Sequence, residues 1–286
     1  MNRAERRLRA TPSRSTSMLP GALVALSLAS GISLAGAVPA SSTNGCPTAA
    51  APTVGDGVNS PYEISSGAEL QWLNENSPHW GDDFILTADI SLAGCTWTST
   101  IGDAATPFTG TFDGDGFAIT DVTVEVDGDY ALATQDGMSG FFGNLGAGAQ
   151  VRDLSVAGTV VADITGQGTF AYAGGIAGIA TQATLENVDF EGTVSATALD
   201  PQSDTEHALA GGIVGSASGV TLLEVSSSAA VSAVSDGRPS AGGLLGYANN
   251  SSAVTDSWSV GSVLADGDVQ STAGGLVGVG TDLSVE

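Results

Sequence analysis

The residues best able to do chemistry in this sequence are acidic pairs separated by one glycine. Phe112-Asp113-Gly114-Asp115-Gly116 is the clearest, and Asp127-Gly128-Asp129 and Asp266-Gly267-Asp268 repeat its spacing. On a strand, residues two apart share a face, so Asp113 and Asp115 could offer hard oxygen ligands to calcium. Asp-Gly is also common turn chemistry between strands, and no bidentate Glu follows at the offset of a dedicated calcium loop. The pattern favours turns over calcium and keeps Asp113 and Asp115 as calcium candidates.

Histidine and serine chemistry has little support. His79 and His207 lie far apart without ligand-type neighbours, so we expect both to be exposed loop residues. The sequence contains no Gly-x-Ser-x-Gly elbow with a plausible base, no Cys-x-x-Cys pair and no phosphate-binding loop. We therefore expect no catalytic residue and, apart from calcium, no cofactor.

The enzymatic alternative is a β-helix lyase or hydrolase that degrades polysaccharides with paired carboxylates. A lyase would also need Lys or Arg for acidic sugars, and only Arg152 and Arg238 occur beyond the first forty residues. A cleft with aromatic side chains and paired acids on successive coils would favour the enzyme. A smooth surface of Ser, Thr and Asp would favour a scaffold.

Cys46 and Cys95 are the cysteines of the chain. In an exported protein, an isolated pair more often forms a disulfide than a metal or catalytic site. We predict a disulfide that ties the start of the exported chain to its first strands.

The elements that would position these residues repeat along the chain. A Gly-Gly-aliphatic-aliphatic-Gly unit, such as Gly174 to Gly178, recurs with its closing glycines 35, 37, 31 and 32 residues apart. A second element follows each of the first four copies and alternates apolar with small or polar residues, as in Val151 to Val160. This alternation is typical of strands. The closing glycines are Gly143, Gly178, Gly215, Gly246 and Gly278.

These repeats predict a parallel β-solenoid. Each short strand must bend at a corner, and glycine permits both positive φ and close approach of neighbouring backbones, so we assign the closing glycines to the corners. The apolar residues would form one continuous core that no single repeat could bury alone. A β-propeller is the competing architecture, but three short strands per repeat fit 31 to 37 residues better than the four strands of a blade.

Residues 62–137 differ from the repeats and are richer in aromatic residues. Ser66 and Glu69 have the spacing of a capping box, which predicts a short helix ending near Asn76. Strand-like segments follow, so we interpret the region as an N-terminal cap and the first coils. Among the repeats, residues 196–209 are expected to form a loop.

The repeats resemble those of bacterial secreted and surface proteins that carry GLUG motifs, named for Gly-Leu-any-Gly. Gly243-Leu244-Leu245-Gly246 and Gly275-Leu276-Val277-Gly278 match the motif, and the resemblance covers roughly residues 55–286. It implies a right-handed parallel β-helix in an adhesin-like protein and supplies no catalytic residue. Some family members cleave immunoglobulin A with a separate zinc domain. This chain has no His-Glu-x-x-His, so that activity does not transfer.

The N-terminus has the features of a secretory signal peptide. Arg3 to Arg14 form a basic region, an apolar stretch runs from Leu19 to Ala37, and small residues offer cleavage after Ala37 or Ala40. Without residues 1–40 the chain keeps 30 acidic residues, two arginines and no lysine, a net charge of −28. Such a charge disfavours nucleic acid and anionic membranes, and no other segment is apolar enough to span a bilayer.

The sequence thus predicts an all-β chain, a right-handed parallel β-helix with a short N-terminal capping helix. Residues 1–40 would be the signal peptide, 41–61 a linker, 62–137 the cap with the first coils, and 138–286 the GLUG-type repeats, of which the last is incomplete. We expect a secreted or cell-surface scaffold that binds an extracellular glycan or protein. The last repeat is incomplete, so we also expect the chain to be part of a longer protein, and an activity could reside in its missing C-terminal region.

Overall fold

The protein is described from a computed structural model that covers residues 44–127, 137–165, 170–200 and 206–286. The chain divides into two compact units, residues 1–38 and 39–286. The predicted signal peptide, residues 1–40, lies outside the described residues, and the fold below is that of the second unit.

The segment that precedes the first strand packs along the cap. The amide of Ala50 donates to the carbonyl of Ala68, and the amide of Thr96 donates to the carbonyl of Asn44. The predicted disulfide between Cys46 and Cys95 is confirmed, and both cysteines are buried. Residues 44–61 of the expected linker over 41–61 contain no helix or strand and are tied to the cap by a covalent bond and by hydrogen bonds.

The cap is built on one short helix, α1 (Gly67–Glu75), followed by a 3-10 turn, η1 (Ser77–His79). The helix predicted from the capping-box spacing is confirmed, with Ser66 as its N-cap. The hydroxyl of Ser66 accepts a hydrogen bond from the amide of Glu69, and the Glu69 carboxylate accepts from the amide of Ser65 at 2.8 Å. The helix buries Leu70 and Leu73, which close the end of the apolar core.

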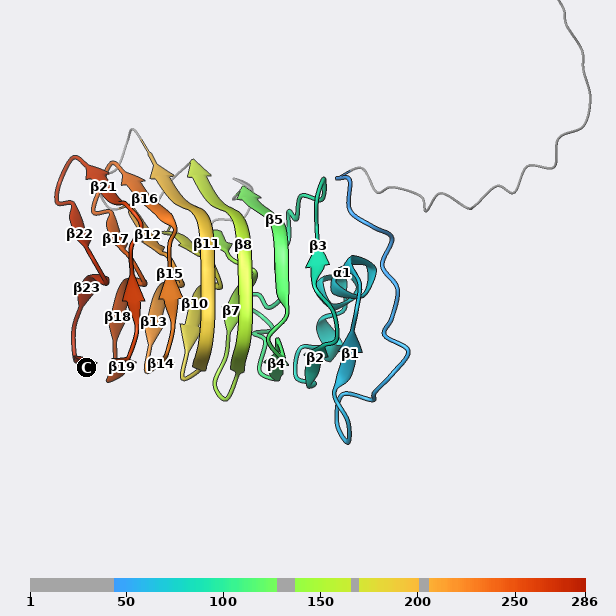
Figure 1. Ribbon diagram of the computed structural model, residues 1–286. Coiled ribbons are helices and arrows are strands. Elements are labelled where there is room, and N and C mark those ends of the chain that lie inside the picture. Colours follow the sequence, from blue (N-terminus) through green and yellow to red (C-terminus); the bar gives the residue numbers. More distant parts are fainter. Residues whose placement is uncertain (1–43, 128–136, 166–169, 201–205) are drawn as a thin grey trace, which may run out of the picture. The chain divides into compact units, whose positions relative to one another are not determined.

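The remainder is a parallel β-solenoid in which successive coils stack strand on strand (Figure 1). Three sheets, A, B and C, run along the stack. The strands of sheet A are β1 (Tyr62–Ile64), β2 (Phe84–Leu86), β3 (Ile90–Ser91), β4 (Thr111–Asp113), β5 (Ala118–Asp127), β8 (Gln150–Thr165), β11 (Thr184–Leu199), β14 (Thr221–Leu223), β15 (Ser226–Ser227), β16 (Ala230–Ser235), β19 (Ser252–Thr255), β20 (Trp258–Ser259), β21 (Val263–Gly267) and β24 (Leu283–Val285). Sheet B contains β7 (Phe142–Leu145), β10 (Ala177–Thr181), β13 (Val214–Ser218), β18 (Leu245–Asn249) and β23 (Val277–Gly280). Sheet C contains β6 (Gly137–Ser139), β9 (Phe170–Gly174), β12 (His207–Gly211), β17 (Ser240–Gly242) and β22 (Thr272–Gly274).

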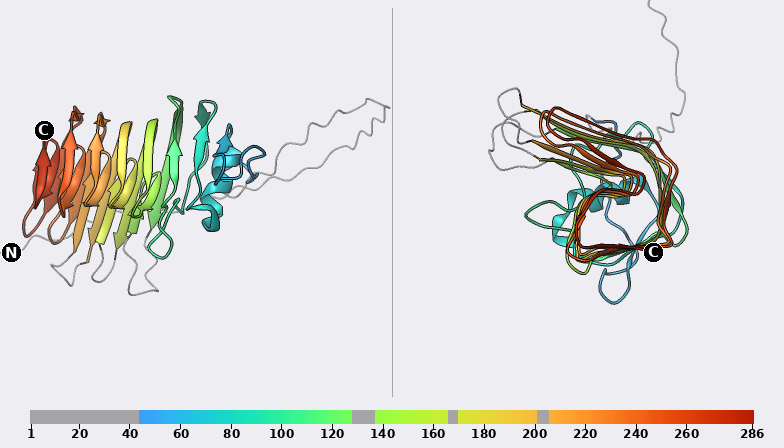
Figure 2. Two further views of the ribbon diagram at one scale, coloured as in Figure 1. Left: turned by 90° about the horizontal axis from the view of Figure 1, so that it is seen from below. Right: turned by 90° about the vertical axis from the view of Figure 1, so that its left-hand side faces the viewer.

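Equivalent residues lie above one another from coil to coil. In sheet A, Val151 pairs with Leu185, Leu185 with Leu222, and Leu222 with Val254. These residues are buried, so one apolar column passes through the four coils. Viewed along the stack, the coils superpose (Figure 2, right). The register turns each position of the sequence repeat into a column of side chains.

Sheets C and B meet at the glycine-rich corner, where our assignment of the corner residues was wrong. The second glycine and the residue after it make the corner, as in Gly243-Leu244. The closing glycines Gly143, Gly178, Gly215, Gly246 and Gly278 are instead the second residues of the sheet B strands. The corner glycines do not have positive φ. Close approach requires them, because a Cβ on Gly243 would lie 2.0 Å from the carbonyl oxygen of Gly275 in the next coil.

Among the described residues, two further corners of the repeat coils use the left-handed backbone region. Asn187 has a φ of 52°, and its side-chain amide donates to the carboxylate of Asp153 in the preceding coil at 2.7 Å. Asn and Asp tolerate this conformation better than most residues. The column of this corner, within sheet A, is Asp153, Asn187, Glu224 and Asp256. The corner between sheets B and A is made by Gly148, Gln182, Gly219, Ser251 and Asp282.

Sheet C packs on the C-terminal halves of β8 and β11 to form a thin two-layer wing. Its buried positions are mainly alanine, among them Ala162, Ala173, Ala196 and Ala210. Such small side chains let the two sheets approach closely without leaving voids. The loop expected over 196–209 is much shorter, since β11 continues to Leu199 and β12 begins at His207.

Candidate functional site

A groove crosses the outer face of sheet A from β5 to β20. One wall is a column of outward side chains that the strand register places one above another. This column consists of Ala118, Ser155, Asp189, Ser226 and Trp258. The second column is Thr120, Ala157, Glu191 and Ser228. The buried Ile119, Val156 and Phe190 lie between the two columns, and the groove encloses about 490 Å³.

The groove continues into a second hollow of about 570 Å³ that shares Thr120, Ala157 and Glu191 with the first. It follows the line where β8 and β11 curve toward the wing (Figure 1). Gly158 and Gly192 occupy this bend. Gly192 has a φ of 138°, and a Cβ on it would lie 1.9 Å from the carbonyl oxygen of Gly158. Position 192 therefore requires glycine, and the bend makes the surface concave.

The polar groups of the groove are hydroxyls and carboxylates. Asp189 and Glu191 are exposed on β11, and the hydroxyl of Ser226 donates to the Asp189 carboxylate. The residues aligned with this acid pair on the adjoining coils are serine or alanine. Among the groove residues described, no pair of acids therefore faces another pair on the next coil.

Trp258 ends the first column and is 52% exposed. Its neighbour in the preceding coil is Ser226, and among the described residues no strand pairs with the other edge of β20, so the indole is open on that side. An exposed indole beside hydroxyls and carboxylates can stack on an apolar ligand face while the neighbouring groups bond its polar edge. The arrangement suits recognition of a ligand with alternating apolar and hydroxylated surfaces.

The calcium candidates lie outside this groove. Arg152 donates to one oxygen of Asp113 at 2.9 and 2.7 Å, and the amide of Asp115 donates to the other at 2.9 Å. Through the hydrogen bond first and its charge second, Asp113 raises the pKa of Arg152. Asp115 is exposed in the turn, with a φ of 48°. These contacts describe an Asp-Gly turn closed by an ion pair.

The structure shows no cluster of metal-ligating side chains in the ranges it describes: no three His, Cys, Asp or Glu residues there come together around one point. Of the two other acidic pairs, Asp129 lies outside the described residues, while Asp266 and Asp268 are both exposed near the end of β21.

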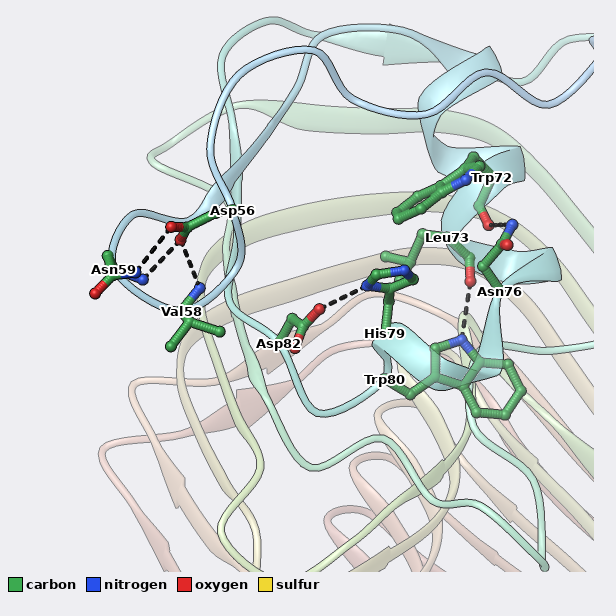
Figure 3. Close-up of polar contacts among 9 residues, drawn as sticks. All are labelled: Asp56, Val58, Asn59, Trp72, Leu73, Asn76, His79, Trp80 and Asp82. Atoms are coloured by element: carbon green, nitrogen blue, oxygen red, sulfur yellow. Dashed lines mark hydrogen bonds and ion pairs between the residues drawn. The ribbon is translucent and has the colours of Figure 1, made fainter.

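Both histidines differ from our expectation of exposed loop residues. His79 ends η1, and its Nδ1 lies 2.7 Å from an Asp82 carboxylate oxygen (Figure 3). Its ring lies 4.8 Å from that of Trp72 and 5.7 Å from that of Tyr62. In the same view, Trp80 donates from its indole to the carbonyl of Leu73 at 2.8 Å, which holds the turn on the helix. These contacts make the His79 cluster part of the cap's packing.

A second turn in Figure 3 contains Asp56, the acidic residue of the segment before β1. The side-chain amide of Asn59 and then the backbone amides of Val58, Ser60 and Asn59 hold the pKa of Asp56 well below its usual range. The group is fully exposed, so this is a tight local turn and not a buried site.

His207 lies in strand β12, not in a loop. Its ring stacks on Phe170 with centroids 4.9 Å apart and planes 10° apart. Burial, and next the charge of Arg238, lower the pKa of His207. The stacking of His207 on Phe170 could not be predicted from the sequence, because it joins residues of neighbouring coils that are 37 positions apart.

Sequence reasoning also missed the groove, although the signal was present. Ser155, Asp189, Ser226 and Trp258 each occupy the same position of the repeat's second element. Aligning the repeats would have placed these residues in one column. Periodicity alone did not show that this column borders a concave bend.

Comparison with known proteins gives the fold and a partial sequence relative. No family model matches the chain. Halomucin from Haloquadratum walsbyi (strain DSM 16790 / HBSQ001) is 28% identical over 146 residues, which is 48% of this chain and 1% of halomucin. A crystal structure of a candidate immunoglobulin A1 protease from Bacteroides ovatus superposes with a TM-score of 0.52 and 20% identity, covering 80% of this chain and 76% of that one. At this identity the likeness concerns the fold alone.

In the described ranges, none of the helices has the length and apolar character needed to cross a membrane.

Proposed function

We propose that this chain is a secreted or cell-surface β-solenoid that acts as a structural and adhesive scaffold, with no catalysis of its own. It binds an extracellular glycan or protein along the groove of sheet A. The observation that carries the proposal is the groove itself, which crosses stacked coils and combines hydroxyls, carboxylates and the exposed Trp258. A column of rigidly spaced groups offers the same contacts to a ligand that is itself extended or repetitive.

Three observations support export. A disulfide persists in oxidising surroundings and is rare in the cytosol, and Cys46 and Cys95 form one. The N-terminal sequence has the order of a signal peptide. The partial relative, halomucin, carries a name that fits a surface protein, and the GLUG resemblance points to the same location.

The charge narrows the partner class. Outside the first forty residues there are two arginines and no lysine, so phosphate-rich nucleic acid and anionic membrane surfaces are repelled. Hydroxyl-rich ligands accommodate an acidic groove because carboxylates accept hydrogen bonds from hydroxyl groups. Neutral glycans therefore fit the groove of sheet A better than acidic ones.

The test is a screen of glycans and extracellular proteins followed by variants of the groove. Trp258→Ala and Glu191→Gln should each weaken the strongest ligand about tenfold, the effect of losing roughly 1.4 kcal/mol. Glu186→Gln is the matched control, since Glu186 is exposed on the same strand, outside the lining of both hollows. Unchanged affinity in Trp258→Ala and Glu191→Gln would remove the groove from the function.

One observation favours a glycoside hydrolase as the second candidate. Asp121 and Glu191 both line the second hollow, with Ala157 of β8 between them. Two coil steps separate their backbones by about 9–10 Å. In inverting hydrolases the two carboxyl groups lie roughly 6.5–9.5 Å apart. Ser91 and Thr120 donate hydrogen bonds to Asp121. Release of reducing ends from a polysaccharide by the protein, and its loss in Glu191→Gln but not in Glu186→Gln, would replace the scaffold proposal.

A further inference from the structure

A second groove lies on other faces of the solenoid, where the outer surfaces of sheets B and C meet at the glycine-rich corner. It encloses about 220 Å³ and is lined from sheet C and the segments leading into it by His207, Arg238, Gln270 and Thr272, and from sheet B by Tyr247. The lining residues belong to three successive coils. The groove exists because glycine lets sheets B and C fold toward each other at this corner.

The charge of this groove differs from that of the remaining surface. Beyond the first forty residues, Arg152 and Arg238 are the only basic residues apart from two histidines. Arg152 is paired with Asp113 at 2.7 Å. Arg238 is exposed and forms no ion pair with any carboxylate that the structure describes. The groove thus presents a guanidinium within a strongly acidic chain.

Arg238 extends a column of flat side chains on the outer face of sheet C. His207 stacks on Phe170. Leu209 pairs with Ser240 of the next coil, and His207 and Arg238 each lie two residues before these partners. The register therefore places Arg238 next to His207 on the coil that follows, while Phe170 lies on the coil that precedes it. Burial of the imidazole, and next the charge of Arg238, lower the pKa of His207. Arg238 is therefore the source of positive charge in the groove.

We propose that this groove binds an acidic saccharide, whose carboxylate pairs with Arg238 and whose ring lies against Tyr247. The inference rests on the proposed role in ligand binding and adds a ligand class and a second site to it. The planar guanidinium matches a carboxylate with two parallel hydrogen bonds. Tyr247 contributes an amphipathic ring, and Gln270 and Thr272 contribute groups that can bond hydroxyls.

Charge screening allows an anion to bind here, and the geometry of the sheets separates a saccharide from an acidic peptide. The Debye length is about 8 Å in physiological salt, so the distant acids of the chain are screened while a contact with Arg238 is not. An acidic peptide commonly adds to a sheet as an extra strand, but this groove is lined by sheet faces, whose backbone groups are already paired with the neighbouring coils. A saccharide needs only the side chains.

The experiment is calorimetric titration of the full chain with digalacturonate, with neutral digalactose and with a short polyaspartate peptide. Digalacturonate should bind wild type, and Arg238→Gln should weaken it about tenfold or more, as loss of a charge-assisted bidentate pair does. Arg152→Gln is the matched control and should leave the affinity unchanged. Tyr247→Ala should weaken digalacturonate as well. Circular dichroism melting checks that each variant is folded.

Three results would overturn the proposal: equal affinity of wild type and Arg238→Gln, equal affinity for digalacturonate and digalactose, or tighter binding of the peptide than of the sugar. None of them affects the groove of sheet A. That site is tested by Trp258→Ala and Glu191→Gln. The ligand that the screen finds for the groove of sheet A should bind Arg238→Gln as tightly as wild type. Failure of the acidic saccharide can therefore be told apart from failure of the scaffold proposal.

Discussion

His207 makes the stability of the folded protein depend on pH. Burial and the charge of Arg238 lower its pKa in the folded protein. In the unfolded chain the histidine titrates at about pH 6.5. The folded state thus binds the proton less readily, and the contribution of His207 to stability, fully present above the unfolded pKa, is lost as the pH falls through the folded pKa.

We predict that His207→Gln reduces the loss of stability that wild type shows as the pH falls below about 6.5. The measurement is urea unfolding at a series of pH values. Arg238→Gln should raise the pKa of His207, read from the imidazole resonances by NMR, because it removes the repelling charge. A folded-state pKa at or above the ordinary histidine value would contradict the stacked, partly buried geometry.

Asp113 gives a prediction about calcium. Both of its oxygens already accept hydrogen bonds, one from Arg152 and one from the amide of Asp115. A calcium ion would have to displace the guanidinium and would find no third acidic ligand among the described neighbours. Millimolar calcium should therefore shift the melting temperature of wild type no more than millimolar magnesium does. The same should hold for Asp113→Asn. A calcium-specific rise in wild type that is absent from Asp113→Asn would restore the metal site.

At the scale of elements, the repeat predicted the coils but not the residues that turn them. Both positive φ and close approach select glycine, so the motif alone could not tell which of its three glycines forms the corner or why. The backbone shows that a side chain on Gly243 would meet the carbonyl oxygen of Gly275, while Gly246 lies in the next strand. The cap was more predictable, because the bonds between Ser66 and Glu69 are local and follow from their spacing.

The groove could not be predicted for a related reason. Alternation predicted that Asp189 and Glu191 point outward, and this is confirmed. Whether an outward column lies on a flat or a concave surface depends on the bend at Gly192, whose φ is not encoded by periodicity. The contacts of His207 with Phe170 depend on register across a coil and were likewise hidden.

Two glycines at the same position of successive coils test the corner directly. A Cβ on Gly243 would lie 2.0 Å from a backbone carbonyl oxygen, whereas a Cβ on Gly275 would meet no atom within 4 Å. Gly243→Ala should cost about 3 kcal/mol or more, since backbone atoms cannot yield as a side chain can. Gly275→Ala, the matched control, should stay within about 0.5 kcal/mol of wild type. Chemical unfolding measures both, and equal losses would show that close approach to the next coil does not select these glycines.

At the scale of the whole molecule, stacking places like charges at the coil spacing. The chain carries 31 acidic against seven basic residues, and the register brings Glu224 and Asp256 to the same corner of adjacent coils. Coils repeat about every 4.8 Å. The Debye length is about 10 Å in 0.1 M salt and about 3 Å in 1 M salt. Repulsion between coils therefore persists in dilute buffer and is screened only near molar salt.

We predict that the melting temperature of wild type rises with sodium chloride up to the molar range, because screening relieves repulsion in the compact state. Glu224→Gln should be a few tenths of a kcal/mol more stable than wild type in dilute buffer, and the difference should vanish in molar salt. Glu63→Gln is the matched control, since Glu63 is exposed and its partner in the next coil is Ile85. Its difference from wild type should change less with salt. If the greater stability of Glu224→Gln persisted in molar salt, it would come from the left-handed corner itself and not from charge. A melting temperature of wild type that falls with added salt would contradict repulsion between coils.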